Sequence, residues 1–174
     1  IMKTKDMTKK LTLCGIFAAL CIVFLYIGGF TVADLSLLVV CAIMTMVILV
    51  ETGEKYAWVY VGVTSTLALI LLPSKLYAFE YIMLSAVYPI LKMHFERMRN
   101  LFAWLVKISC LDCMLLLLVV LGQYVFMAGD EFFSLSVVTV AVGTVFFVLY
   151  DFCLSACITL YMVKLRKKFT KTKR

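Results

Sequence analysis

Charged residues are scarce in this sequence. They make up 16% of its 174 residues, and hydrophobic residues make up 65%, whereas an ordinary soluble domain has about 25% charged and roughly 45–50% apolar residues. A water-soluble globule of this size could not bury so much apolar surface, so most of its exterior would be apolar. The scarcity of charge therefore excludes a soluble domain and predicts a polytopic integral membrane protein whose outer surface is solvated by lipid.

Histidine and the common catalytic motifs are also lacking. His94 is the one histidine, and it is far in the sequence from every cysteine, so a zinc site of the usual kind is not expected. The sequence has no Walker phosphate loop, no Gly-x-Ser-x-Gly elbow and no zinc-protease helix motif. We therefore expect neither an enzyme nor a cofactor, and any active transport would draw its energy from a partner or a gradient.

What the sequence has is long apolar runs. Such a run needs about 20 residues to span a bilayer as a helix, with a range of roughly 17–25. Charges and turn formers divide the chain into six apolar segments, at residues 11–30, 35–50, 56–72, 76–91, 101–127 and 132–163. We predict a single transmembrane domain over residues 1–174, an all-α membrane protein built as a six-helix bundle. The fourth segment is expected to end at Tyr88-Pro89, ahead of a polar inner loop that contains Lys92.

The net charge of +7 is distributed as in a membrane protein. Basic residues gather at the predicted helix ends and at both ends of the chain, which is unlike a nucleic-acid-binding face. If both termini are cytoplasmic, nearly all lysines and arginines face the cytoplasm, while Lys75 faces outward and Lys107 lies inside the fifth segment. We predict a multi-pass protein of the cell membrane with both termini cytoplasmic, the lipid bilayer as a partner and no nucleic acid partner.

Four ionisable side chains are predicted to lie at membrane depth, where their cost makes them candidates for function. Lys107 and Asp151 fall at similar depth on the fifth and sixth segments, so we predict an ion pair between these helices. Glu80, near the outer end of the fourth segment, and Asp112, about 16 Å into the fifth, are the predicted ligand-binding residues. A solvated Glu80 at the outer interface and a structural role for Asp112 remain the alternatives.

All seven cysteines fall in apolar runs. Cys110-x-x-Cys113 has the spacing of redox pairs, and Cys153-x-x-x-Cys157 places two thiols on one helical face. Stronger metal ligands are not expected near either pair. We interpret these cysteines as small apolar filler and predict no metal site.

Small residues line one side of the first segment, at Cys14, Gly15, Ala18 and Ala19. This spacing permits a close approach of another helix, either within the chain or from another protein. Residues 9–20, with the sequence KKLTLCGIFAAL, resemble the opening of the substrate-binding S components of energy-coupling-factor vitamin transporters. The chain length, the six predicted helices and the cytoplasmic termini are similar too.

The resemblance implies an S-component-like fold and a role as a membrane-embedded substrate-binding subunit for a small nutrient, a vitamin or a metal ion. It also implies a separate coupling transmembrane subunit with ATPases, which would contact Cys14, Gly15, Ala18 and Ala19. Two features depart from the family. The first outer loop, at residues 31–34, is too short for the lid of many S components, and no vitamin-specific motif matches.

Other hypotheses remain beside this one. Residues 88–92, YPILK, and 149–151, LYD, also resemble a group of uncharacterised small bacterial membrane proteins with no known transport role. Short loops and a missing pocket motif would equally suit a structural or scaffold membrane protein of the rod-shape-determination type. An intramembrane enzyme that uses Asp112 and Asp151 is the least favoured, because no nucleophile and base stand at a diagnostic spacing.

Overall fold

The computed structural model describes residues 2–31, 34–95, 100–120 and 137–166. These residues are almost entirely helical and include no strand, which confirms the all-α fold class. The elements, in chain order, are α1 (Met2–Gly28), α2 (Asp34–Thr52), α3 (Glu54–Leu71), α4 (Lys75–Glu80), the π-helix η1 (Tyr81–Val87), α5 (Tyr88–Phe95), α6 (Asn100–Val120), α7 (Val137–Leu160) and the π-helix η3 (Tyr161–Arg166).

Three stretches of the described helices are long and apolar enough to cross a bilayer, namely Met7–Gly28, Asp34–Thr52 and Val142–Val163. They fit a transmembrane protein, and the count of six spans stays a prediction. The described helix α1 starts at Met2 instead of residue 11, because the lysine-rich segment continues the helix beyond the apolar run. The predicted helix ends at residues 121–127 and 132–136 lie outside the described residues.

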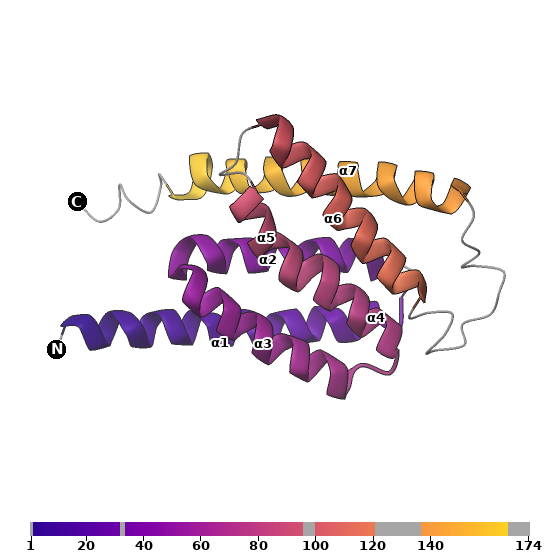
Figure 1. Ribbon diagram of the computed structural model, residues 1–174. Coiled ribbons are helices and arrows are strands. Elements are labelled where there is room, and N and C mark those ends of the chain that lie inside the picture. Colours follow the sequence, from indigo (N-terminus) through magenta and orange to yellow (C-terminus); the bar gives the residue numbers. More distant parts are fainter. Residues whose placement is uncertain (1, 32–33, 96–99, 121–136, 167–174) are drawn as a thin grey trace.

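Helix α2 forms the centre of the molecule. It contacts α1, α3, η1, α5 and α7, and its Cys41, Ala42 and Ile48 are fully buried. Helix α6 packs mainly on α7 and runs at an incline to it (Figure 1). The start of α1 and the end of η3 lie at the same end of the molecule (Figure 1).

Two connections have clear local causes. Between α2 and α3 the chain turns at Gly53, whose φ of 92° lies in the left-handed region that favours glycine. After α3, Ser74 caps the next helix, because its hydroxyl oxygen accepts a hydrogen bond from the Tyr77 backbone N–H at 3.3 Å. Both turns fall at breaks that the sequence predicts.

The fourth helix does not end at Pro89. It runs without interruption from Lys75 to Phe95 as α4, η1 and α5. A proline in a helix normally clashes with the carbonyl four residues earlier, but here the preceding turn is a π-turn in which the Tyr88 N–H bonds to the Met83 carbonyl. The wider turn accommodates the ring, as π-bulges commonly do at kinks. The predicted loop position of Lys92 is therefore wrong, since this lysine lies in α5.

Candidate functional site

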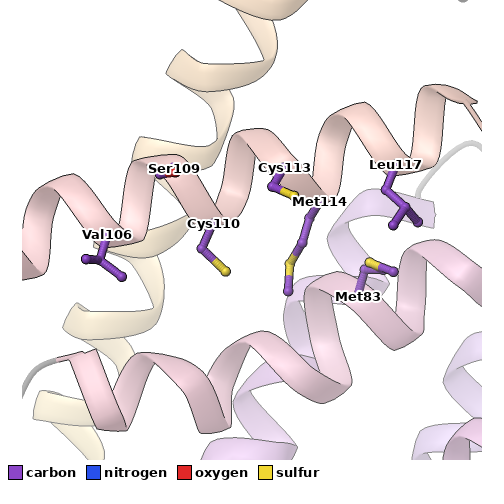
Figure 2. A pocket seen from close by; sticks show the side chains of 7 residues that line it. All are labelled: Met83, Val106, Ser109, Cys110, Cys113, Met114 and Leu117. Carbon is purple, nitrogen blue, oxygen red and sulfur yellow. The ribbon is translucent and has the colours of Figure 1, made fainter.

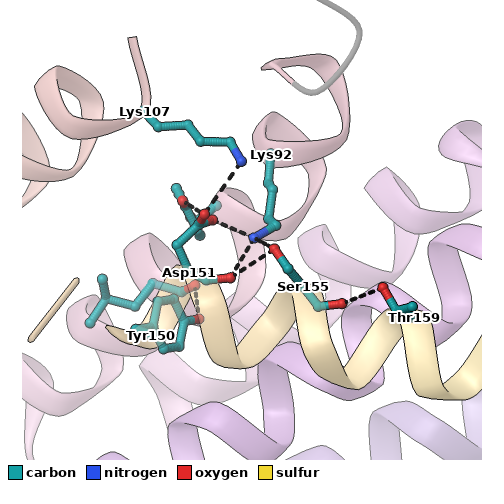
Figure 3. Close-up of polar contacts among 8 residues, drawn as sticks. Lys92, Lys107, Tyr150, Asp151, Ser155 and Thr159 are labelled. Atoms are coloured by element: carbon teal, nitrogen blue, oxygen red, sulfur yellow. Dashed lines mark hydrogen bonds and ion pairs between the residues drawn. The ribbon is translucent and has the colours of Figure 1, made fainter. Parts of the chain in front are cut away.

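A buried polar cluster joins α5, α6 and α7 around the carboxylate of Asp151. Lys92, which has no exposed surface, forms an ion pair with Asp151 Oδ1 and donates to the Asp151 carbonyl oxygen at 2.6 Å and to Ser155 Oγ at 2.7 Å. The Tyr88 hydroxyl donates to Asp151 Oδ1 at 2.6 Å. Lys107 reaches Asp151 Oδ2 from α6 at 3.3 Å. Figure 3 shows the two lysines meeting Asp151 from different helices.

Helical spacing explains how these groups meet. Tyr88 and Lys92 are four residues apart on α5, and Asp151 and Ser155 are four residues apart on α7, so each pair lies on one face of its helix. The two faces are turned toward each other, and all four side chains engage across the contact. A carboxylate at apolar depth is thereby supplied with several hydrogen-bond donors, as a buried charge requires.

The structure brings the predicted pair of Lys107 and Asp151 together. It also places Lys92 closer to Asp151 than Lys107 is, a contact that was not predicted from the sequence. The signal that could have found Lys92 is its four-residue spacing from Tyr88. This spacing places both side chains on one face only if the helix continues past Pro89, as it does in α5. Because three helices converge on one carboxylate, the cluster fixes their relative positions.

Asp112 is half-buried and faces α7. Its Oδ1 accepts a hydrogen bond from the Thr144 hydroxyl at 3.0 Å. Together with Lys107 and Asp151, this contact gives α6 and α7 two polar connections at different depths. The arrangement supplies a structural partner for Asp112, and its ligand-binding role stays a prediction.

Glu80 lies half-buried on α4, near the start of the fourth helix. Within the described residues its carboxylate makes no hydrogen bond or ion pair, and nothing joins it to Asp112. The nearby Tyr77 hydroxyl donates to the Asp34 carbonyl at 3.3 Å and so connects α4 to the start of α2. The structure therefore does not combine the two predicted ligand-binding carboxylates into one site.

A cavity of about 630 Å³ lies between η1 and α6 (Figure 2). The lining is mostly apolar, with one hydroxyl, and consists of Met83, Val106, Ser109, Cys110, Cys113, Met114 and Leu117. Cys113 and Leu117 are exposed, so the cavity opens at the surface of the bundle. None of the residues that the sequence analysis proposed as ligand-binding lines it.

The wall formed by η1 is held from behind. Ser85 donates to the Leu38 carbonyl of α2 at 2.8 Å, and the Tyr81 hydroxyl donates to Thr64 Oγ1 of α3 at 2.8 Å. These bonds fix the π-helix against the core and leave Met83 on the side that faces α6. This cavity was not predicted, because its walls meet only when η1 packs beside α6 and no sequence pattern marks a π-helix.

The four small residues of α1 divide between its two faces. Cys14 and Ala18 are buried in the core against the other helices, at 7% and 8% exposure. Gly15 and Ala19 are exposed, and a Cβ added to Gly15 would meet nothing within 4 Å. Of the predicted partner interface, Gly15 and Ala19 are therefore the residues that another helix can reach.

Within the described residues, no three histidine, cysteine or carboxylate side chains converge as a metal centre. Comparison of the chain with known protein families, with characterised proteins and with solved structures gives no match.

Proposed function

We propose that this chain is a membrane-embedded substrate-binding subunit for the uptake of a small nutrient, and that a separate module supplies the energy. The observation that carries the proposal is the cavity between η1 and α6. Its volume of about 630 Å³ falls within the roughly 300–1,000 Å³ of small-ligand sites. A mostly apolar lining with one hydroxyl, Ser109, suits a small solute taken out of water.

Both walls of the cavity are held by polar contacts with the rest of the bundle. Helices α5 and α7 are fixed by Lys92 and Asp151, and η1 is fixed by Ser85 and Tyr81. Helix α6 is held on α7 by the Lys107–Asp151 ion pair and by the hydrogen bond from Thr144 to Asp112. In the proposed mechanism both walls keep their positions when the solute enters.

The exposed face of α1 is evidence for a separate energising module. Gly15 and Ala19 are exposed beside the large exposed side chains of Ile16 and Leu20. A shallow strip of small residues between larger ones allows a partner helix to approach closely. The predicted coupling subunit would contact α1 on this face.

The first test fills the cavity. Leu117 and Leu116 are neighbours on α6 with similar exposure, 41% and 43%, but Leu117 lines the cavity and Leu116 does not. The full chain is purified in detergent, and the small molecules and metals that remain bound are identified by mass spectrometry. We expect Leu117→Phe to lose the bound solute at least tenfold and Leu116→Phe to retain it.

The second test concerns the partner. Gly15 on α1 and Gly62 on α3 are both exposed, with open space around each. We expect Gly15→Leu to abolish copurification of a coupling subunit with its ATPases, while Gly62→Leu leaves it unchanged. If the unaltered chain retains no solute and captures no coupling subunit, the proposal is wrong and the scaffold hypothesis takes its place.

A further inference from the structure

Sulfur is concentrated on the cavity between η1 and α6. Four of the seven described lining residues carry sulfur, namely Met83, Cys110, Cys113 and Met114. In the whole chain, only 10 methionines and 7 cysteines occur among 174 residues. These side chains come from two elements. Figure 2 shows Cys110 and Met114 pointing from α6 toward the helix of Met83, and Met83 pointing back toward α6.

The positions on α6 are those of a ligand set on one helical face. Cys110, Cys113 and Met114 stand at i, i+3 and i+4, a spacing that places their Cβ atoms about 5–6 Å apart. From such positions sulfur atoms can converge on one metal ion at a bond length of about 2.3 Å. Met83, on the opposite wall, adds a ligand that a single helix could not provide.

We propose that this cavity binds a soft monovalent cation, Cu(I), through the Cys110 thiolate and the thioethers of Met114 and Met83. Cys113 is exposed at the rim and is not one of the three proposed ligands. The inference rests on the proposed function, because it names the class of solute that the subunit takes up. It departs from the interpretation of these cysteines as filler, which rested on the lack of stronger metal ligands near them in the sequence.

The ligand chemistry selects the ion. Thiolate and thioether sulfur prefer Cu(I), whereas Mg²⁺, Ca²⁺ and Mn²⁺ prefer oxygen. Among the described lining residues, Ser109 carries the only side-chain oxygen. Charge points the same way. When Cu⁺ binds, the Cys110 thiol loses a proton to water and a Cu–S bond forms, so the cation and the thiolate leave a neutral site. A divalent ion on the same three ligands would leave a net positive charge in an apolar cavity, at a high cost.

The test titrates the detergent-purified full chain with Cu(I) under anaerobic conditions, in competition with a chromogenic Cu(I) chelator. Cys153 and Cys157 on α7 serve as a matched thiol pair, four residues apart but away from the cavity. We expect Cys153→Ser/Cys157→Ser to retain one Cu(I) per chain and Cys110→Ser to bind it at least 100-fold more weakly. Met83→Leu, which conserves side-chain volume, should bind at least tenfold more weakly, while Met93→Leu should match the unaltered chain.

X-ray absorption of the loaded protein gives a readout that does not depend on affinity, and we expect copper surrounded by three sulfur atoms. Unchanged affinity in Cys110→Ser or in Met83→Leu would overturn the inference, and so would oxygen or nitrogen as the main copper ligands. If the chain fails to bind Cu(I) but retains an organic solute that Leu117→Phe displaces, the inference fails and the proposed function stands. If no solute of any kind is retained and no coupling subunit copurifies, both fail.

Discussion

At the residue scale, Lys92 and Asp151 show how a membrane bundle tolerates charge. Lys92 has no exposed surface, and its ammonium is surrounded by a carboxylate, a carbonyl and a hydroxyl oxygen. These three acceptor oxygens therefore replace the water that burial removes from the ammonium. Removal of one member of such a buried pair typically costs more than the pair contributes, because the other charge remains buried.

The residue-scale prediction follows from this asymmetry. Lys92→Met deprives Asp151 of its closest cation, and we expect the free energy of unfolding to fall by about 3–5 kcal/mol. The measurement is chemical unfolding in mixed micelles, followed by circular dichroism. His94→Gln on the same helix is the control, since it removes the half-exposed His94–Glu54 contact of 3.8 Å and should change stability by less than about 1 kcal/mol. Similar small effects of both changes would show that Lys92 does not hold α5 and α7 together.

At the scale of elements, the helix boundaries separate what local chemistry specifies from what it does not. Gly53 and Ser74 set their turns through backbone conformation and capping, which operate within a few residues, so the sequence predicted both breaks. The helix end predicted at Pro89 was wrong, because the effect of a proline on a helix depends on the turn before it. The π-turn at Tyr88 and Met83 removes the usual clash, and that turn is itself held by contacts with α2 and α3, distant in sequence.

The contact between α6 and α7 carries the element-scale prediction. Asp112 accepts a hydrogen bond from Thr144, and an asparagine oxygen can accept the same bond. If the role of Asp112 is to connect these helices, Asp112→Asn should leave the free energy of unfolding within about 1 kcal/mol of the unaltered chain, and Asp112→Leu should lower it by about 1–3 kcal/mol.

Solute retention distinguishes this role from ligand binding. Asp112→Asn removes the charge but keeps the shape, so a solute that depends on the carboxylate would be lost from the purified protein. We expect it to be retained, because the Asp112 side chain is absent from the cavity lining. Loss of the solute from a stable Asp112→Asn protein would show that the Asp112 carboxylate takes part in ligand binding.

At the scale of the whole molecule, composition and helical periodicity predicted more than pairwise chemistry did. The all-α class followed from apolar runs, and the contact of Lys107 with Asp151 was expected because both residues had similar predicted depths. Depth alone could not show that Lys92 would reach the same carboxylate, or that Met83 would face Cys110 and Met114 across a cavity. These contacts depend on how neighbouring helices are rotated about their axes, and this rotation cannot be predicted from a single sequence.

The predicted orientation in the membrane is the whole-molecule claim that remains to be tested. Lys75 and Lys55 lie at opposite ends of the helical bundle, because Lys75 follows α3 and Lys55 begins it. We expect a membrane-impermeant maleimide to label Lys75→Cys in intact cells, and to label Lys55→Cys only after the membrane is permeabilised. The unaltered chain measures the background from its own cysteines, of which Cys113 and Cys153 are exposed on the bundle surface. The reverse pattern would place the basic ends outside, against the positive-inside rule, and labelling of both positions from outside would mean that α3 does not cross the membrane.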